Sequence, residues 1–119
     1  MVSRVIPVEA FDLVIFGGTG DLARRKILPG LFRRFIAGQM PEKAQIIGAA
    51  RSQFEDGGYR EFVNEALLEF GPKGISADSL EAFLDRLDYV AIDAKGTGGW
   101  SELAAKMRKG HVRAFYFSV

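Results

Sequence analysis

A glycine-rich turn near the N-terminus contains the residue types that hold a phosphate group. It consists of Gly17, Gly18, Thr19, Gly20, Asp21, Leu22 and Ala23. Gly18, Gly20 and Ala23 match the spacing G-x-G-x-x-A, and Gly17 offers a second register of the same kind. Glycine allows a tight turn and a close approach of backbone N–H groups to an anion, and the N-terminus of a following helix adds partial positive charge. The turn therefore predicts the pyrophosphate site of a dinucleotide, although similar glycine pairs also close strand–helix turns that bind no ligand.

Charged residues follow the glycines at the start of the predicted helix. Asp21 lies in the first helical turn, where a carboxylate interacts favourably with the helix dipole. We expect its side chain to turn away from a bound phosphate, because both groups are negatively charged. Arg24, Arg25 and Lys26 come next. Two interpretations stay open for these basic residues: a solvated face of the helix, or, for Lys26 above all, a contact with the phosphates.

Arg51 and Ser52 directly follow a second apolar segment. An enzyme that prefers NAD has an acidic residue near this position, where it accepts hydrogen bonds from the ribose. A guanidinium group instead binds a phosphate through paired hydrogen bonds. Arg51 therefore predicts recognition of the 2′-phosphate of NADP, with a solvated loop arginine as the alternative.

Four further residues have side chains of types that occur in binding and catalytic sites. Asp93 follows the third predicted strand, at the edge where ligands of open α/β sheets bind, but it is equally compatible with a turn. Tyr116 lies in the last predicted strand and, from the residues alone, is a candidate core residue. We also expect Trp100 in the core. His111 is expected on the surface at the opposite edge of the sheet, where it does not act as a catalytic base.

Apolar patterning places these residues on alternating strands and helices. Short apolar segments bounded by turn residues predict strands, and apolar residues at helical spacing predict helices. The expected strands are residues 11–16, 45–50, 89–92 and 112–119, and the expected helices are residues 22–36, 59–70, 76–87 and 100–109. This alternation predicts an α/β fold, a Rossmann-type doubly wound parallel sheet with helices on both faces, of which the chain holds the first part.

Three residues predict how the helices begin and end. Pro29 lies inside the first helical pattern, where it either begins a second helix or kinks a continuous one. Gly38 is expected to end that pattern. Ser79 is expected to cap the helix over residues 76–87.

Composition excludes several classes of protein. The 119 residues are 48% hydrophobic and 26% charged with a net charge of +1, which is typical of a globular domain and gives no basic footprint for nucleic acid. No apolar run approaches the ~20 residues that span a bilayer. The absence of cysteine excludes disulfides, thiolate nucleophiles and cysteine zinc sites, and a single histidine excludes an all-histidine metal site. We therefore predict no metal, no nucleic-acid partner and no membrane partner.

The two ends of the chain suggest how it is organised. Residues 1–10 lack the apolar core of ~7 to 15 residues that a secretory signal needs, so we expect a flexible leader and a cytoplasmic protein. Residues 11–119 are expected to form one N-terminal dinucleotide-binding domain. Because the last predicted strand is apolar and no helix follows it, we expect this domain to be incomplete at its C-terminal end and to belong to a longer protein.

The segment DLVIFGGTGDLARRKILP, residues 12–29, resembles the N-terminal part of glucose-6-phosphate dehydrogenases. The segments IGAARS, residues 47–52, and FYFSV, residues 115–119, support this resemblance. It covers nearly all of the chain from about Phe11. The family often has alanine where this chain has Gly18, a departure that we expect to be harmless.

The resemblance implies an NADP-dependent dehydrogenase of the oxidative pentose phosphate pathway. Such an enzyme oxidises glucose 6-phosphate to 6-phosphogluconolactone and transfers hydride to NADP. The resemblance assigns the nucleotide site to residues 17–24 together with Arg51, Asp93, Ala94 and Tyr116, and it assigns Lys26 to the junction of cofactor and substrate. It implies that the catalytic histidine and the substrate-phosphate residues follow Val119, so no catalytic residue is assigned here and the chain alone is expected to be inactive.

The resemblance also implies that the full-length protein is a homo-oligomer. The alternative function is a non-catalytic module that senses NADP or binds a partner on the same fold, because a fold alone does not fix a function. A short-chain or epimerase-type enzyme would need a Tyr-x-x-x-Lys pair, which does not occur in the sequence.

Overall fold

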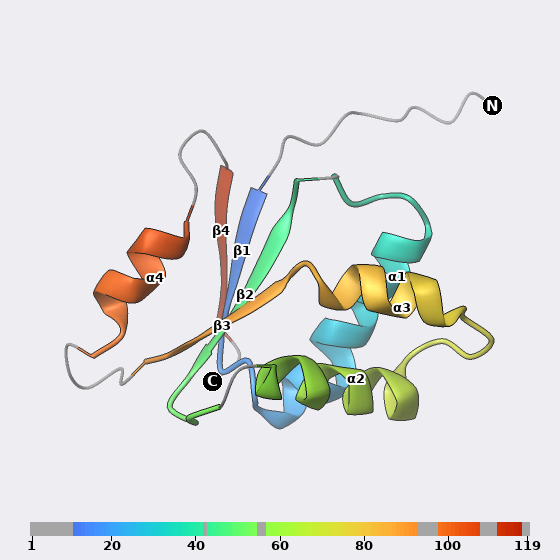
Figure 1. Ribbon diagram of the computed structural model, residues 1–119, viewed down its shortest axis with the longest axis horizontal. Coiled ribbons are helices and arrows are strands. Elements are labelled where there is room, and N and C mark those ends of the chain that lie inside the picture. The colour runs from blue at the N-terminus through green and yellow to red at the C-terminus, as the bar shows by residue number, and fades with distance from the viewer. Residues whose placement is uncertain (1–10, 42, 55–56, 93–97, 108–111, 118–119) are drawn as a thin grey trace.

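A parallel sheet of four strands forms the centre of the computed structural model, which describes residues 11–41, 43–54, 57–92, 98–107 and 112–117 (Figure 1). The elements are β1 (Phe11–Phe16), η1 (Ala23–Ile27), α1 (Leu28–Ile36), β2 (Gln45–Ala50), α2 (Gly58–Phe70), α3 (Ala77–Leu84), β3 (Leu87–Ala91), α4 (Trp100–Lys106) and β4 (Val112–Phe117). The predicted leader and the residues Asp93, Ala94 and His111 lie outside the described residues.

The strands lie in the order β3-β2-β1-β4, and every neighbouring pair is parallel. In the register, Leu13 of β1 pairs with Ile46 on one side and with Ala114 on the other. The chain first moves outward from β1 to β2 and β3, and α4 then leads it back past both strands to β4 (Figure 1). This reversal of strand order beside β1 confirms the predicted doubly wound α/β sheet.

The two faces of the sheet are covered by different helices. Side chains alternate along a strand, so neighbouring residues point to opposite faces. Ile15 and Ile46 pack against α1, α2 and α3, whereas Val14 and Ile47 pack against Leu103 of α4. All five side chains are at most 3% exposed. Burial on both faces explains why β1 and β2 have nearly continuous apolar sequences instead of alternating ones.

The helical segment after the glycine turn changes its hydrogen-bond pattern just before Pro29. The residues Ala23–Ile27 form a π-helical turn, in which the N–H of Leu28 donates to the carbonyl of Ala23. Pro29 then lies in the first turn of α1, where its missing N–H is tolerated. Of the two alternatives for Pro29, the structure has the first: the proline lies in the first turn of a new helix, α1, which begins at Leu28 directly after η1. Gly38 ends this segment with a left-handed φ of 73°, as predicted.

The start and end of α3 differ from the prediction. Ser76 is the N-cap, and its Oγ accepts a hydrogen bond of 3.2 Å from the N–H of Ser79. The prediction that Ser79 caps this helix is wrong, because the extended backbone that a cap requires occurs at Ser76, with ψ of 151°. The helix ends at Leu84, and Leu87, predicted to be helical, is the first residue of β3.

Aromatic residues near β4 are more exposed than predicted. Tyr116 is 44% exposed and Trp100 is 41% exposed, so neither is a core residue in this structure. Trp100 instead lies against one side of the ring of Phe16, with centroids 5.8 Å apart. β4 is an edge strand of the described sheet, and Phe115 and Tyr116, which point to opposite faces of it, are 47% and 44% exposed.

Candidate functional site

The loops that follow the strands meet at one edge of the sheet. The carboxyl ends of β1, β2 and β4 point toward the bottom of the view in Figure 1, and the glycine turn, residues 17–23, continues from β1 at that edge. Ligands of open α/β sheets bind outside the carboxyl ends of the strands, where strand order reverses. In this structure the reversal occurs between β1 and β4.

The glycine turn is attached to β2 by its backbone. Gly17 has a left-handed φ of 80°, which favours glycine, and its N–H donates to the carbonyl of Ala49 over 2.8 Å. The N–H of Gly18 donates to the same carbonyl over 3.2 Å. Gly20 accepts from the N–H of Arg24 over 3.0 Å, which is the first helical hydrogen bond after the turn. The turn is therefore held beside the end of β2, at a residue that lies two positions before Arg51 in the sequence.

Gly18 is in close contact with α2. A Cβ atom at this position would come within 2.9 Å of the hydroxyl of Tyr59 and 3.1 Å of the carbonyl oxygen of Ile15. In this chain the departure from the alanine that is frequent in the family is thus matched by a tyrosine that occupies the space. The glycine spacing predicted the turn, but nothing in the sequence pointed to Tyr59.

Asp21, Arg24 and Arg25 form a cluster with the end of α2. The carboxylate of Asp21 accepts from Arg25 over 2.8 Å and from Arg24 over 3.3 Å. Arg24 also reaches Glu69 over 3.3 Å, and both guanidinium groups lie over the ring of Phe70. The hydrogen bond from Arg25 is the main reason that the pKa of Asp21 is lowered from its usual value. Arg24, predicted to bind the cofactor, thus contacts α2 in this structure.

An open groove lies at the carboxyl ends of β2 and β3 and has a volume of about 480 Å³. Its walls come from the loop after β2, the end of β3 and the start of α4, and its lining residues are Arg51, Gln53, Ala91, Ile92, Gly98, Gly99 and Glu102. The volume lies in the range of roughly 300–1,000 Å³ that is common for ligand pockets. Arg51 is exposed, so its guanidinium group is accessible from the groove side.

Gln53, Gly99 and Glu102 line the groove but were not among the predicted site residues. Gly99 has a left-handed φ of 87°, and a Cβ there would overlap with the carbonyl of Ala91. This glycine therefore allows α4 to begin directly against β3. The available signal in the sequence is the group Gly96, Gly98 and Gly99, and such a group predicts only a turn.

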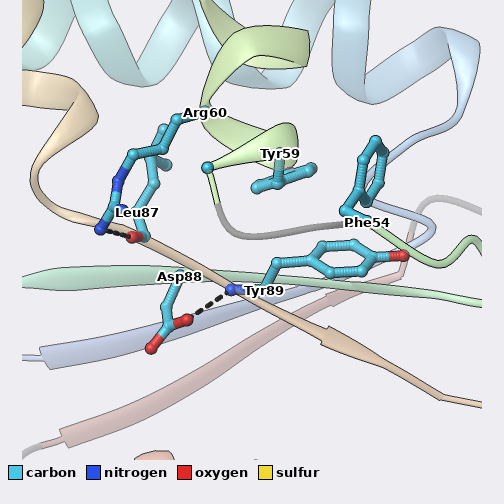
Figure 2. A pocket seen from close by; sticks show the side chains of 7 residues that line it. Phe54, Tyr59, Arg60, Leu87, Asp88 and Tyr89 are labelled. Carbon is cyan, nitrogen blue, oxygen red and sulfur yellow. Dashed lines mark hydrogen bonds between the residues drawn. The ribbon is translucent and has the colours of Figure 1, made fainter.

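A second pocket of about 240 Å³ lies under the start of α2 (Figure 2). The charged groups at its rim already have partners. Arg60 donates to the carbonyls of Leu84 and Leu87 over 3.0 and 2.9 Å, and Asp88 pairs with Lys106 over 3.0 Å. Its lining joins the start of β3, at Leu87 and Asp88, to Phe54 and Gly57 from the segment between β2 and α2.

The other predicted site residues have the following positions. Thr19 is half-buried in the turn, Leu22 is 45% exposed, and Ala23 is fully buried beneath the first helical turn. Lys26 is exposed on η1. Tyr116 lies opposite Ile15 in the register of β4 with β1. Among the described residues, no group of three acidic or histidine side chains could hold a metal, and no helix is long and apolar enough to cross a membrane.

The comparisons with known proteins agree with this geometry. The family model of the glucose-6-phosphate dehydrogenase NAD binding domain matches residues 14–119. The chain belongs to the glucose-6-phosphate dehydrogenase family. The resemblance seen in the sequence is thus confirmed, and the ligand class that the family model names for this domain is a nicotinamide dinucleotide.

Relatives within the glucose-6-phosphate dehydrogenase family are similar over the whole chain. A glucose-6-phosphate 1-dehydrogenase of Rhizobium meliloti is 46% identical over 100% of this chain, and one of Gluconobacter oxydans is 46% identical over 93%. The chain spans only 25% and 24% of the length of these two relatives.

Solved structures of the family share the fold. A crystal structure of glucose-6-phosphate 1-dehydrogenase from Mycobacterium avium superimposes with a TM-score of 0.81, at 29% identity over 93% of this chain and 24% of that protein. A glucose-6-phosphate dehydrogenase in complex with its substrate superimposes with a TM-score of 0.77, at 26% identity over 96% of this chain and 26% of that protein. The Rossmann-type fold is therefore the fold of this family.

Proposed function

We propose that this chain is the NADP-binding part of a glucose-6-phosphate 1-dehydrogenase, which oxidises glucose 6-phosphate to 6-phosphogluconolactone with hydride transfer to NADP. The observation that carries the proposal is the position of Arg51, which lines the groove and directly follows the strand whose residue Ala49 holds the glycine turn. The relatives named above are all dehydrogenases of glucose 6-phosphate, which favours this function over a non-catalytic sensing module.

The donor groups at the carboxyl edge suit NADP. Backbone N–H groups at the start of a helix bind a pyrophosphate, and the left-handed Gly17 fixes the turn that presents them. A guanidinium group suits the doubly charged 2′-phosphate, and Arg51 supplies it at the end of β2. In the proposed complex, residues 17–23 hold the pyrophosphate and Arg51 holds the 2′-phosphate.

The remaining roles follow from the family resemblance. Asp93, Ala94 and Tyr116 are proposed to contact the nucleotide, as is Arg24 if it leaves its partners on α2. Lys26 is proposed to lie between cofactor and substrate. NADP supplies the ring that accepts hydride, while this chain binds and orients it. No catalytic residue is assigned to the chain, and the full-length protein is proposed to be a cytoplasmic homo-oligomer.

Replacing Arg51 tests the proposal. In the full-length protein, Arg51→Ala should weaken NADP binding by about 10- to 100-fold, the factor expected for a charge-assisted hydrogen-bonded contact, while NAD binding stays unchanged. Isothermal titration calorimetry with each nucleotide measures the two dissociation constants. Arg34→Ala removes the same charge from the exposed surface of α1 and should leave both constants unchanged. Equal affinity of the unaltered protein for NADP and NAD would contradict the proposed role of the 2′-phosphate.

A further inference from the structure

Tyr59 connects the start of α2 with the glycine turn. Its side chain is 3% exposed, and its hydroxyl donates a hydrogen bond of 3.0 Å to the carbonyl of Gly18. The ring covers Gly48 of β2 so closely that a Cβ there would lie 2.6 Å from Cε2 of Tyr59. The hydroxyl is therefore held in one position by the packing of its own ring.

This hydrogen bond sets the direction of a backbone N–H. The carbonyl of Gly18 and the N–H of Thr19 belong to one planar trans peptide, in which the two groups point in opposite directions. Because Tyr59 holds the carbonyl toward α2, the N–H of Thr19 points away from this buried side chain. Thr19 belongs to the turn that is proposed to bind the pyrophosphate.

Tyr89 of β3 holds the neighbouring loop in a similar way. Its hydroxyl shares its hydrogen between the carbonyl of Ser52, at 2.7 Å, and that of Ala50, at 3.1 Å. These two carbonyls stand on either side of Arg51 in the sequence. The N–H of Ile92 also donates to Ala50, over 2.7 Å. The backbone around Arg51 is thus fixed to β3 on both sides of that residue.

The two tyrosines belong to one aromatic cluster, with ring centroids 4.8 Å apart. Phe54, which follows the Arg51 loop, packs edge-on against Tyr89 with centroids 4.8 Å apart and contacts Tyr59 at 5.8 Å. Figure 2 shows Tyr59 on α2 facing Tyr89 on β3, with Phe54 beside them. Burial raises the pKa of both hydroxyl groups, so both remain protonated donors at neutral pH.

We infer that Tyr59 and Tyr89 are positioning residues with separate tasks, Tyr59 for the pyrophosphate turn and Tyr89 for the Arg51 loop that recognises the 2′-phosphate. The inference rests on the proposed function, because it assumes that NADP occupies this edge. The two proposed roles predict different effects on nucleotide binding. Both NADP and NAD contain the pyrophosphate, but only NADP contains the 2′-phosphate. Tyr59 therefore affects the binding of both nucleotides, and Tyr89 affects only NADP.

The test uses Tyr59→Phe and Tyr89→Phe in the full-length protein, with the dissociation constants of NADP and NAD as the readout. Each change keeps the ring and removes one hydrogen-bond donor. Tyr59→Phe should weaken the binding of both nucleotides by about fivefold, the factor for one neutral hydrogen bond, and leave the ratio of their dissociation constants unchanged. Tyr89→Phe should weaken the binding of NADP by about fivefold and change the dissociation constant of NAD by less than about twofold, so the preference for NADP falls.

For Tyr89, the ratio of the two constants distinguishes positioning from a general structural role. Both nucleotides bind the same folded molecules, so a partial loss of folded protein changes both constants equally and leaves their ratio unaffected. For Tyr59, the free energy of unfolding in urea makes this distinction, because positioning predicts weaker binding by a variant that is still fully folded. An equal effect of Tyr89→Phe on NADP and NAD, or an unchanged NADP constant in either variant, would overturn the inference. Failure of the unaltered protein to bind NADP would instead overturn the proposed function, so the two failures are distinguishable.

Discussion

At the scale of single residues, the site depends on small residues that are matched to one large one. Gly48 lies in β2, and the ring of Tyr59 occupies the space that any side chain at this position would need. Tyr59 has little room to move, because it is packed against Phe62 at 5.8 Å and against Tyr89 at 4.8 Å. Protein interiors are close-packed, so one extra methyl group must displace a neighbour.

We therefore expect Gly48→Ala to destabilise the protein. Overpacking of this kind costs roughly 1–3 kcal/mol, and the loss should appear in the free energy of unfolding in urea. Gly30→Ala is the matched control, because apart from the adjacent backbone of its own helix no atom lies within 4 Å of a Cβ at that position. There the same change should raise the stability by up to about 1 kcal/mol through helix propensity. If Gly48→Ala were as stable as the unaltered protein, the ring of Tyr59 would not be fixed as described.

At the scale of elements, the sequence predicts the existence of helices and strands better than their boundaries. The apolar spacing of α2 and the apolar run of β2 decide their types, because each buries its side chains in a regular pattern. The start of α3 could not be decided in this way. Ser76 and Ser79 are both good capping residues three positions apart, and only the backbone angles at Ser76 select it. Pro29 was similarly compatible with two arrangements.

The capping hydrogen bond of α3 gives the prediction at this scale. Ser76→Ala removes the acceptor for the N–H of Ser79 and should lower the free energy of unfolding by about 1 kcal/mol. Ser79→Ala leaves that N–H and its bond intact and removes only an exposed hydroxyl contact of 3.0 Å, so it should cost no more than about 0.5 kcal/mol. Urea unfolding of both variants measures the difference. A larger effect of Ser79→Ala would contradict the assignment of Ser76 as the cap.

At the scale of the whole molecule, the candidate site combines segments that are far apart in the sequence. The glycine turn and Arg51 were predicted because each directly follows a predicted strand, and the carboxyl ends of parallel strands share one edge. Gln53 and Glu102 could not be predicted, because their place on the groove depends on how α4 lies against the sheet. That arrangement results from the burial of Leu103 and the close approach of Gly99 to β3, which no local pattern encodes.

The two faces of the sheet should therefore respond differently to core mutations. Leu103 attaches α4 to one face, and Phe83 attaches α3 to the other. Leu103→Ala and Phe83→Ala should each lower the free energy of unfolding by several kcal/mol, typically about 2–5 for such truncations.

Their effects on the site should not be equal, because α4 forms a wall of the groove and α3 does not. We expect Leu103→Ala to weaken NADP binding to the folded protein by about tenfold, equivalent to about 1.4 kcal/mol, and Phe83→Ala to change it by less than about twofold. Urea unfolding identifies a temperature at which both variants are folded. Titration with NADP at that temperature then measures the difference in affinity. Equal NADP affinities of the two variants would mean that the position of α4 does not control the groove, and that the nucleotide is held by the glycine turn and Arg51 without this wall.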